Sequence, residues 1–316
     1  MLDRINHENN CFAQDPNRFK IEPEPNETLF DHLKNLTALS LTNNAFKNID
    51  SSMLAGLSRL KSLDMSSNKL TELGDLKSLA DLEELIVMSN ELSNIESNAF
   101  SNLLNLKKLD LSENKLKNLD KNLLANQTNL EELFLGSNSI SEFLPDSIEI
   151  FSQLNNLTYL YLGDNYLKEL NEPKLFEPLV NLKVLVLCYN RIKTIDSNLF
   201  TALKNLTELY LQGNELESIS SNLFDQLTAL NVLVLSENSL KSIDDELFKR
   251  LISLESLDLS ENRLESVHAN AFSALGNLKT LSLRKNQLER IDSQTFRNLR
   301  QLANLDLANN KLNSFK

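Results

Sequence analysis

The sequence contains no tryptophan and has only two cysteines, three histidines, six glycines and six prolines among its 316 residues. Two cysteines, Cys11 and Cys188, are too few for a disulfide framework, and pairing them would require a long reach by the N-terminal segment. Neither the cysteines nor the histidines have the spacing of a metal site, so no metal or other cofactor is predicted. No apolar run approaches the ~18 residues of a membrane span, and the polar first ten residues lack the apolar core of a signal peptide. Membrane contact would therefore need segments outside this chain.

Positive charge is also scarce, because 32 Lys and Arg residues stand against 44 Asp and Glu residues, for a formal net charge of -12. A nucleic-acid-binding protein needs a basic surface to neutralise phosphates, so no nucleic-acid partner is predicted. Phosphate loops and nucleophile elbows are missing as well. Four carboxylates recur at one template position and are interpreted as solvated: Asp64, Asp110, Asp258 and Asp306. We therefore expect that the protein is not an enzyme.

Leucine recurs at a fixed period. Twelve segments follow the template LxxLxLxxNxLxxIxxxxFxxL and begin at Leu36, Leu60, Leu82, Leu106, Leu130, Leu157, Leu182, Leu206, Leu230, Leu254, Leu278 and Leu302. The fourth position is Leu and the ninth is Asn in all twelve repeats. Such a period predicts a solenoid, in which each repeat contacts only its neighbours. We expect a half repeat plus twelve repeats at 30–316, an N-terminal cap or flexible segment at 1–29, and no C-terminal cap.

The template predicts its own local structure. Leucines at alternate positions indicate a short strand with one buried face, and twelve such strands would stack into a parallel sheet. Eight phenylalanines recur in the second half of the repeats and are expected to form a buried spine: Phe100, Phe151, Phe176, Phe200, Phe224, Phe248, Phe272 and Phe296. The repeated Asn is expected to satisfy backbone groups where the chain turns inward, which is a structural role.

This template resembles the leucine-rich repeat family over residues 30–316. The 24-residue unit with Phe resembles the extracellular subclass that includes Toll-like receptor ectodomains, the insulin-like growth factor acid-labile subunit and insect leucine-rich immune proteins. Intracellular phosphatase-regulator types more often use 22-residue units without that Phe. The resemblance implies an α/β repeat solenoid, a horseshoe with a parallel sheet on the concave face and loops, short strands or 3-10 turns on the convex face. The cysteine-rich caps of the family are not seen here.

One part of the predicted concave face differs from the rest. In each strand the third, fifth, seventh and eighth template positions are expected to point out of this face. Repeats 5–9 place aromatic and apolar side chains there: Phe134, Tyr159, Tyr161, Val184, Val186, Cys188, Tyr189, Tyr210, Val232 and Val234. Contiguous apolar surface with a polar rim marks interaction sites, and tyrosine is a frequent hot-spot residue. We therefore predict that a protein ligand binds here, although β-propensity alone would explain single residues.

Five sequons, at Asn26, Asn35, Asn126, Asn156 and Asn205, are candidate glycosylation sites. With the repeat type, they favour a secreted or cell-surface recognition protein of innate immunity or development. Cys188 is expected to be a partly exposed thiol, which counts against an oxidising compartment. A cytosolic scaffold or regulator and a matrix or adhesion component remain as alternatives, and a homo- or hetero-dimer is possible.

Overall fold

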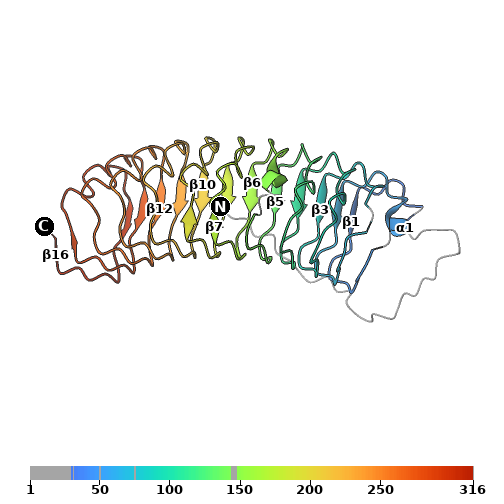
Figure 1. The fold of residues 1–316 in the computed structure, drawn as a ribbon, viewed down its shortest axis with the longest axis horizontal. Helices are drawn as coiled ribbons and strands as arrows, with labels where there is room; N and C mark the ends of the chain where they lie inside the picture. Colours follow the sequence, from blue (N-terminus) through green and yellow to red (C-terminus); the bar gives the residue numbers. More distant parts are fainter. Residues whose placement is uncertain (1–29, 31, 50, 75, 144–147, 316) are drawn as a thin grey trace.

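The computed structural model describes residues 30, 32–49, 51–74, 76–143 and 148–315. The predicted N-terminal segment 1–29, with the sequon at Asn26, lies outside the described residues. Successive coils of the chain stack along one axis from α1 (Ser51–Leu54) at one end to β16 (Ser314–Phe315) at the other (Figure 1). The fold is therefore the predicted solenoid.

Each repeat contributes one strand of three residues to a single parallel sheet. The strands follow one another in chain order: β1 (Ala38–Ser40), β2 (Ser62–Asp64), β3 (Glu84–Ile86), β4 (Lys108–Asp110), β5 (Glu132–Phe134), β6 (Tyr159–Tyr161), β8 (Val184–Val186), β10 (Glu208–Tyr210), β11 (Val232–Val234), β12 (Ser256–Asp258), β13 (Thr280–Ser282) and β15 (Asn304–Asp306). The register pairs equal template positions, so Leu185 lies between Leu160 and Leu209. Because of this register, side chains at the same template position of successive repeats lie side by side in a row across the concave face.

The convex side consists mainly of turns with a few short elements, as predicted. One 3-10 helix, η1 (Ile148–Phe151), lies there. Two short parallel pairs also form, β7 (Glu169–Leu170) with β9 (Thr194–Ile195), and β14 (Arg290–Ile291) with β16. The convex half of a repeat thus needs no continuous secondary structure, because its apolar side chains hold it against the sheet.

The core is a continuous column of leucine and phenylalanine. Seven of the eight predicted spine phenylalanines are fully buried, and Phe296 is partly buried. The rings stack in two runs, from Phe151 through Phe176 to Phe200 and from Phe248 through Phe272 to Phe296. The centroids lie 6.4 Å apart between Phe176 and Phe200 and 6.2 Å apart between Phe248 and Phe272. Burial of such side chains contributes roughly 1.5–3 kcal/mol each to folding. The predicted spine is confirmed.

The repeated Asn satisfies backbone groups of two repeats at once. In the seventh repeat, Asn190 donates through Nδ2 to the carbonyl of Leu162 at 3.0 Å, and its Oδ1 accepts from the Leu167 amide at 3.0 Å. Its side chain also donates to the Leu187 carbonyl of its own repeat at 3.2 Å. Most members of this ladder are buried, so an unpaired group there would cost ~1–3 kcal/mol. The structural role predicted for the ladder is confirmed.

A sharp turn precedes each ladder asparagine. The residue at the eighth template position has a positive φ in all twelve repeats, including Tyr189 at 51° and Gly213 at 68°. This backbone is costly for L-residues other than glycine. Because the conformation recurs in every repeat, it belongs to the turn of the solenoid.

Candidate functional site

The sheet register brings most of the predicted ligand-binding residues into two adjacent rows on the concave face. The fifth-position row runs through Phe134, Tyr161, Val186, Tyr210 and Val234. The third-position row places Tyr159 beside Val184, then continues through Glu208 to Val232. We call the ten predicted residues the concave patch; eight lie on these strands, and Cys188 and Tyr189 follow β8. They are Phe134, Tyr159, Tyr161, Val184, Val186, Cys188, Tyr189, Tyr210, Val232 and Val234.

Aromatic rings meet at the start of the concave patch. The centroids of the Phe134 and Tyr159 rings lie 5.1 Å apart with an interplanar angle of 32°. The ammonium of Lys108 lies 5.7 Å from the Phe134 centroid, and it also approaches the carboxylate of Glu84 to 3.3 Å. A cation over an aromatic ring is attracted by the negative face of the ring. Lys108 therefore lies at this end of the concave patch, where its charge is already paired with Glu84 and with the Phe134 ring.

Three tyrosine hydroxyls of the concave patch donate to carboxylates. Tyr161 donates to Asp164 at 2.9 Å, and Tyr210 donates to Glu208 at 2.7 Å. Tyr189 reaches across two repeats to Glu237, with 3.4 Å between the oxygens. These bonds fix the rings, because each hydroxyl has an anionic acceptor.

The same contacts shift the pKa values of the tyrosines. Burial raises the pKa of Tyr161 and Tyr210, and the hydrogen bonds to Asp164 and Glu208 raise them further. The charge of Glu237 is the main cause of the raised pKa of Tyr189. All three phenols therefore remain protonated at neutral pH and offer neutral contact surfaces.

Three glycines next to the concave patch leave space that side chains of the patch occupy. A Cβ on Gly136 would lie only 1.8 Å from Cε1 of Tyr161, and one on Gly213 would lie 2.4 Å from Cδ1 of Tyr189. A Cβ on Gly163 would meet both Tyr161 and the sulfur of Cys188 at 2.9 Å. The sequence contained a signal for this arrangement, because three of only six glycines occupy concave positions in repeats 5, 6 and 8.

Two residues predicted for ligand contact are instead buried. Cys188 is 6% exposed and Val186 is 8% exposed, so the expectation of a partly exposed thiol is wrong. The sulfur lies against Gly163, and burial is the main cause that raises the pKa of the Cys188 thiol to about 11. Cys188 is a free cysteine. Because the thiol is covered, it no longer counts against an oxidising compartment.

The remaining patch residues reach solvent to different degrees. Tyr189 is 47% exposed, while the other tyrosines of the patch are half-buried. Phe134, Val184, Val232 and Val234 are likewise half-buried. Eight of the ten predicted residues thus present some surface to solvent, and Val186 and Cys188 are buried among the same repeats.

Four of the five sequon asparagines lie within the described residues, and all four are exposed: Asn35, Asn126, Asn156 and Asn205. Asn156 donates to the carbonyl of Thr128 at 2.9 Å, and Asn205 donates to that of Val180 at 2.9 Å. Asparagines at the same position in other repeats make the same bond, as Asn181 does to Asn155 at 2.8 Å. Asparagine at this position therefore links neighbouring repeats through a hydrogen bond, whether or not it carries a glycan.

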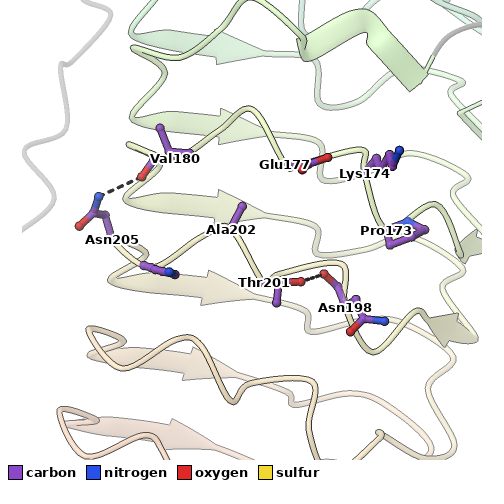
Figure 2. Close-up of a pocket in the computed structure, with 9 residues that line it drawn as sticks. Pro173, Lys174, Glu177, Val180, Asn198, Thr201, Ala202 and Asn205 are labelled. Atoms are coloured by element: carbon purple, nitrogen blue, oxygen red, sulfur yellow. Dashed lines mark hydrogen bonds between the residues drawn. The ribbon is translucent and has the colours of Figure 1, made fainter.

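A depression of about 810 Å³ opens between the loops of the sixth and seventh repeats (Figure 2). Pro173, Lys174 and Glu177 of the longer sixth repeat line one side, and Thr201 and Asn205 line the other. We interpret the depression as a consequence of the extra residue in this loop.

No group of three or more His, Cys, Asp or Glu side chains in the described ranges could hold a metal ion. None of the helices in the same ranges has both the length and the apolar character needed to cross a membrane.

Comparison with curated proteins finds two kinds of relative. Lumican from Oryctolagus cuniculus is 34% identical over 175 residues, which are 54% of this chain and 86% of lumican. A protein phosphatase 1 regulatory inhibitor subunit PPP1R7 homologue from Arabidopsis thaliana is 31% identical over 168 residues, 51% of this chain and 47% of that protein.

Solved structures with the same fold include protein and RNA complexes. A chain of the Drosophila Toll–Spatzle complex has a TM-score of 0.74 at 28% identity, over 83% of this chain and 36% of that one. A chain of the TLR13–ssRNA13 complex has a TM-score of 0.71 at 28% identity, over 91% and 48%. The ectodomain of an Arabidopsis thaliana membrane receptor kinase in complex with CASPARIAN STRIP INTEGRITY FACTOR 2 has a TM-score of 0.67 at 27% identity, over 89% and 34%. This chain thus spans half or less of each of these three structures.

A family model described as a leucine-rich repeat matches residues 26–70, 80–140, 180–240, 228–288 and 276–316. These ranges cover well over half of the sequence. They contain eleven of the twelve sheet strands and eleven of the twelve ladder asparagines, while β6 and Asn165 lie between two matched ranges. The chain belongs to the leucine-rich repeat family.

Proposed function

We propose that this protein is a recognition module that binds a protein ligand through the concave face of repeats 5–9, as a secreted protein or a receptor ectodomain. The observation that carries the proposal is the concave patch itself. Its aromatic and apolar side chains form adjacent rows on neighbouring strands, which is more than β-propensity at scattered positions explains. Such a patch with a polar rim is typical of an interaction site.

The rigidity of the patch suits this role. Tyrosine provides a large contact area and loses little conformational entropy on binding. Here Tyr161 and Tyr210 are already held by their carboxylate partners and lie on strands of a continuous sheet. Side chains that are ordered before binding reduce the entropic cost of association.

The comparisons support a ligand-binding role in general terms. The Toll–Spatzle and receptor-kinase structures are complexes with other proteins, and the latter is described as an ectodomain. The TLR13 structure contains single-stranded RNA. For this chain we favour protein over nucleic acid, because its net charge is -12 and the patch tyrosines are bonded to carboxylates, which would repel phosphates.

Two alternatives have a specific observation behind them. The PPP1R7 homologue favours a cytosolic scaffold or regulator, and lumican favours a matrix or adhesion component. Glycans on Asn35, Asn126, Asn156 or Asn205 of the native protein would separate the cytosolic alternative from the other two. Self-association, measured by analytical ultracentrifugation, would favour an adhesion component over one-to-one recognition. The same measurement tests whether the chain forms a homo-dimer.

The proposal is tested by replacing Tyr161 and Tyr210 together with alanine. The immobilised 316-residue chain is screened against an array of extracellular protein domains, and the affinities of the binders are measured by surface plasmon resonance. If each tyrosine is a hot spot of about 2 kcal/mol, the double variant weakens binding by more than ~100-fold, with little change in melting temperature.

The matched control replaces two exposed residues off the concave patch, Tyr166 and Leu104, which are 44% and 54% exposed. This control should bind as the native chain does. Undiminished binding by the double tyrosine variant would overturn the proposed function.

A further inference from the structure

The concave patch lies in a segment of the concave face that has negative charge only. Across repeats 5–10, the third, fifth, seventh and eighth template positions contain no Lys or Arg. The same positions contain six carboxylates: Glu132, Asp164, Glu208, Glu237, Asp258 and Glu261. We propose that the ligand segment bound here is cationic, a polypeptide stretch in which Lys or Arg side chains alternate with apolar ones. This inference rests on the proposed function and names the class of partner.

Hydrogen-bonding capacity in this segment is dominated by acceptors. The hydroxyl protons of Tyr161 and Tyr210 are already donated to Asp164 and Glu208, so their free lone pairs can only accept. A ligand rich in N–H donors fits such a surface, and an acceptor-rich or anionic ligand does not.

Desolvation makes this preference stronger. A ligand that covers the apolar rows also takes water away from the carboxylates of Asp164, Glu208 and Glu237, which hold the patch tyrosines. Covered charges that gain no partner destabilise a complex. A neutral apolar ligand would leave them without counter-charge, whereas Lys or Arg would pair with them and could also lie on the aromatic faces.

Basic side chains appear at both ends of this acidic segment, and they are already paired. Lys108 approaches Glu84 to 3.3 Å at one end. At the other end Lys285 approaches Glu261 to 2.9 Å, and Arg284 lies 3.9 Å from Asp306. Six strands at a spacing of ~4.8 Å span roughly 24 Å, which an extended segment of about seven residues covers. The acidic segment therefore has the length of a short linear epitope.

The experiment uses a phage-displayed library of random dodecapeptides, selected on the 316-residue chain. Selected peptides are synthesised, and their dissociation constants are measured by fluorescence anisotropy at low and high salt. Two variants are compared, each with three charges neutralised. The first is Asp164→Asn with Glu208→Gln and Glu237→Gln. The matched control, Glu142→Gln with Glu172→Gln and Glu265→Gln, changes exposed residues outside the concave strand positions.

We expect the selected peptides to carry net positive charge and to bind the patch variant about tenfold more weakly than the native chain and the control variant. Their affinity should fall as salt is added. The amide substitutions keep a hydrogen-bond acceptor for each tyrosine, so circular dichroism should be unchanged.

The outcomes also separate this inference from the proposed function. Neutral or acidic peptides that lose binding in the Tyr161→Ala, Tyr210→Ala chain would overturn the cationic ligand and leave the concave site standing. Cationic peptides that bind the two triple variants equally would also overturn it. Peptides whose binding survives the double tyrosine change would contradict the proposed function itself.

Discussion

The ring of Tyr161 occupies the space where Gly136 has no side chain. A Cβ at Gly136 would lie 1.8 Å from Cε1 and 2.3 Å from Cδ1 of that ring, well inside any possible contact distance. The two residues belong to neighbouring repeats, and the ring is held from its other end by the hydrogen bond to Asp164. The glycine therefore sets the position of a tyrosine at the centre of the concave patch.

Gly136→Ala should move this ring. Because the ring can swing towards the open concave face, the free energy of unfolding should fall by about 1 kcal/mol, the lower end of the range for overpacking. Urea unfolding followed by circular dichroism measures it. Gly276→Ala is the control, since a Cβ there meets nothing within 4 Å, and it should be neutral or slightly stabilising. Equal effects of the two changes would contradict this account of Gly136.

The ladder asparagines should matter more than the exposed ones. Asn190→Ala removes the acceptor of the Leu167 amide and the donor to the Leu162 carbonyl, both buried. We expect a loss of at least about 2 kcal/mol in the free energy of unfolding. Asn181→Ala, which breaks one exposed bond, should cost less than ~1 kcal/mol, and the reverse order in urea unfolding would refute the ladder argument.

The Cys188 thiol should be unreactive in the folded protein. A thiol with a pKa of about 11 is ionised at pH 8 to about one part in a thousand, and the site is also covered. In a Cys11→Ser chain, Ellman's reagent should react at least ~100-fold more slowly with native than with urea-unfolded protein. Similar rates in the two states would show that the thiol is open to solvent.

The same thiol predicts a pH effect on stability. Its pKa in the folded state lies above the unfolded value of ~8.5, so the folded chain binds more protons between these values. Its contribution is complete below pH ~8.5 and is lost as the pH rises towards 11. Cys188→Ala should reduce the decrease in the free energy of unfolding over this pH range, measured by urea unfolding. If the free energy of unfolding fell with pH as steeply in the variant as in the native chain, Cys188 would not be the cause.

Glu83 should titrate at unusually low pH. Hydrogen bonds from Lys107 at 2.8 Å and Lys61 at 2.7 Å lower the pKa of Glu83 to about 2. The folded chain then binds fewer protons than the unfolded chain below ~pH 4.3, so this contribution is present above that pH and is lost as the pH falls towards 2.

Carbon-detected NMR of the Glu83 carboxyl would give the midpoint directly. It should rise towards ~4.3 in Lys107→Met and with added salt, because these charges are solvent-accessible. A midpoint near 4.3 in the native chain at low salt would disprove the lysine effect.

Much of the candidate site could be predicted from the sequence. Equal template positions in successive repeats must lie side by side in a parallel solenoid, so the row from Phe134 through Tyr161 to Tyr210 followed from the period alone. The burial of Val186 and Cys188 did not follow, because it depends on how neighbouring side chains pack around them. The direction in which a tyrosine ring leans depends on its χ angles and on free space nearby, which a repeat template does not specify.

The sequence by itself determined the architecture, since the period, the leucines, the spine phenylalanines and the ladder asparagines each satisfy a requirement that recurs in every repeat. Only the tertiary structure decided how the concave patch is built. The contact of Tyr161 with Gly136 and the bond from Tyr189 to Glu237 join different repeats. Such contacts arise from non-repeating side chains competing for the same space, and that competition is resolved only when the coils are stacked.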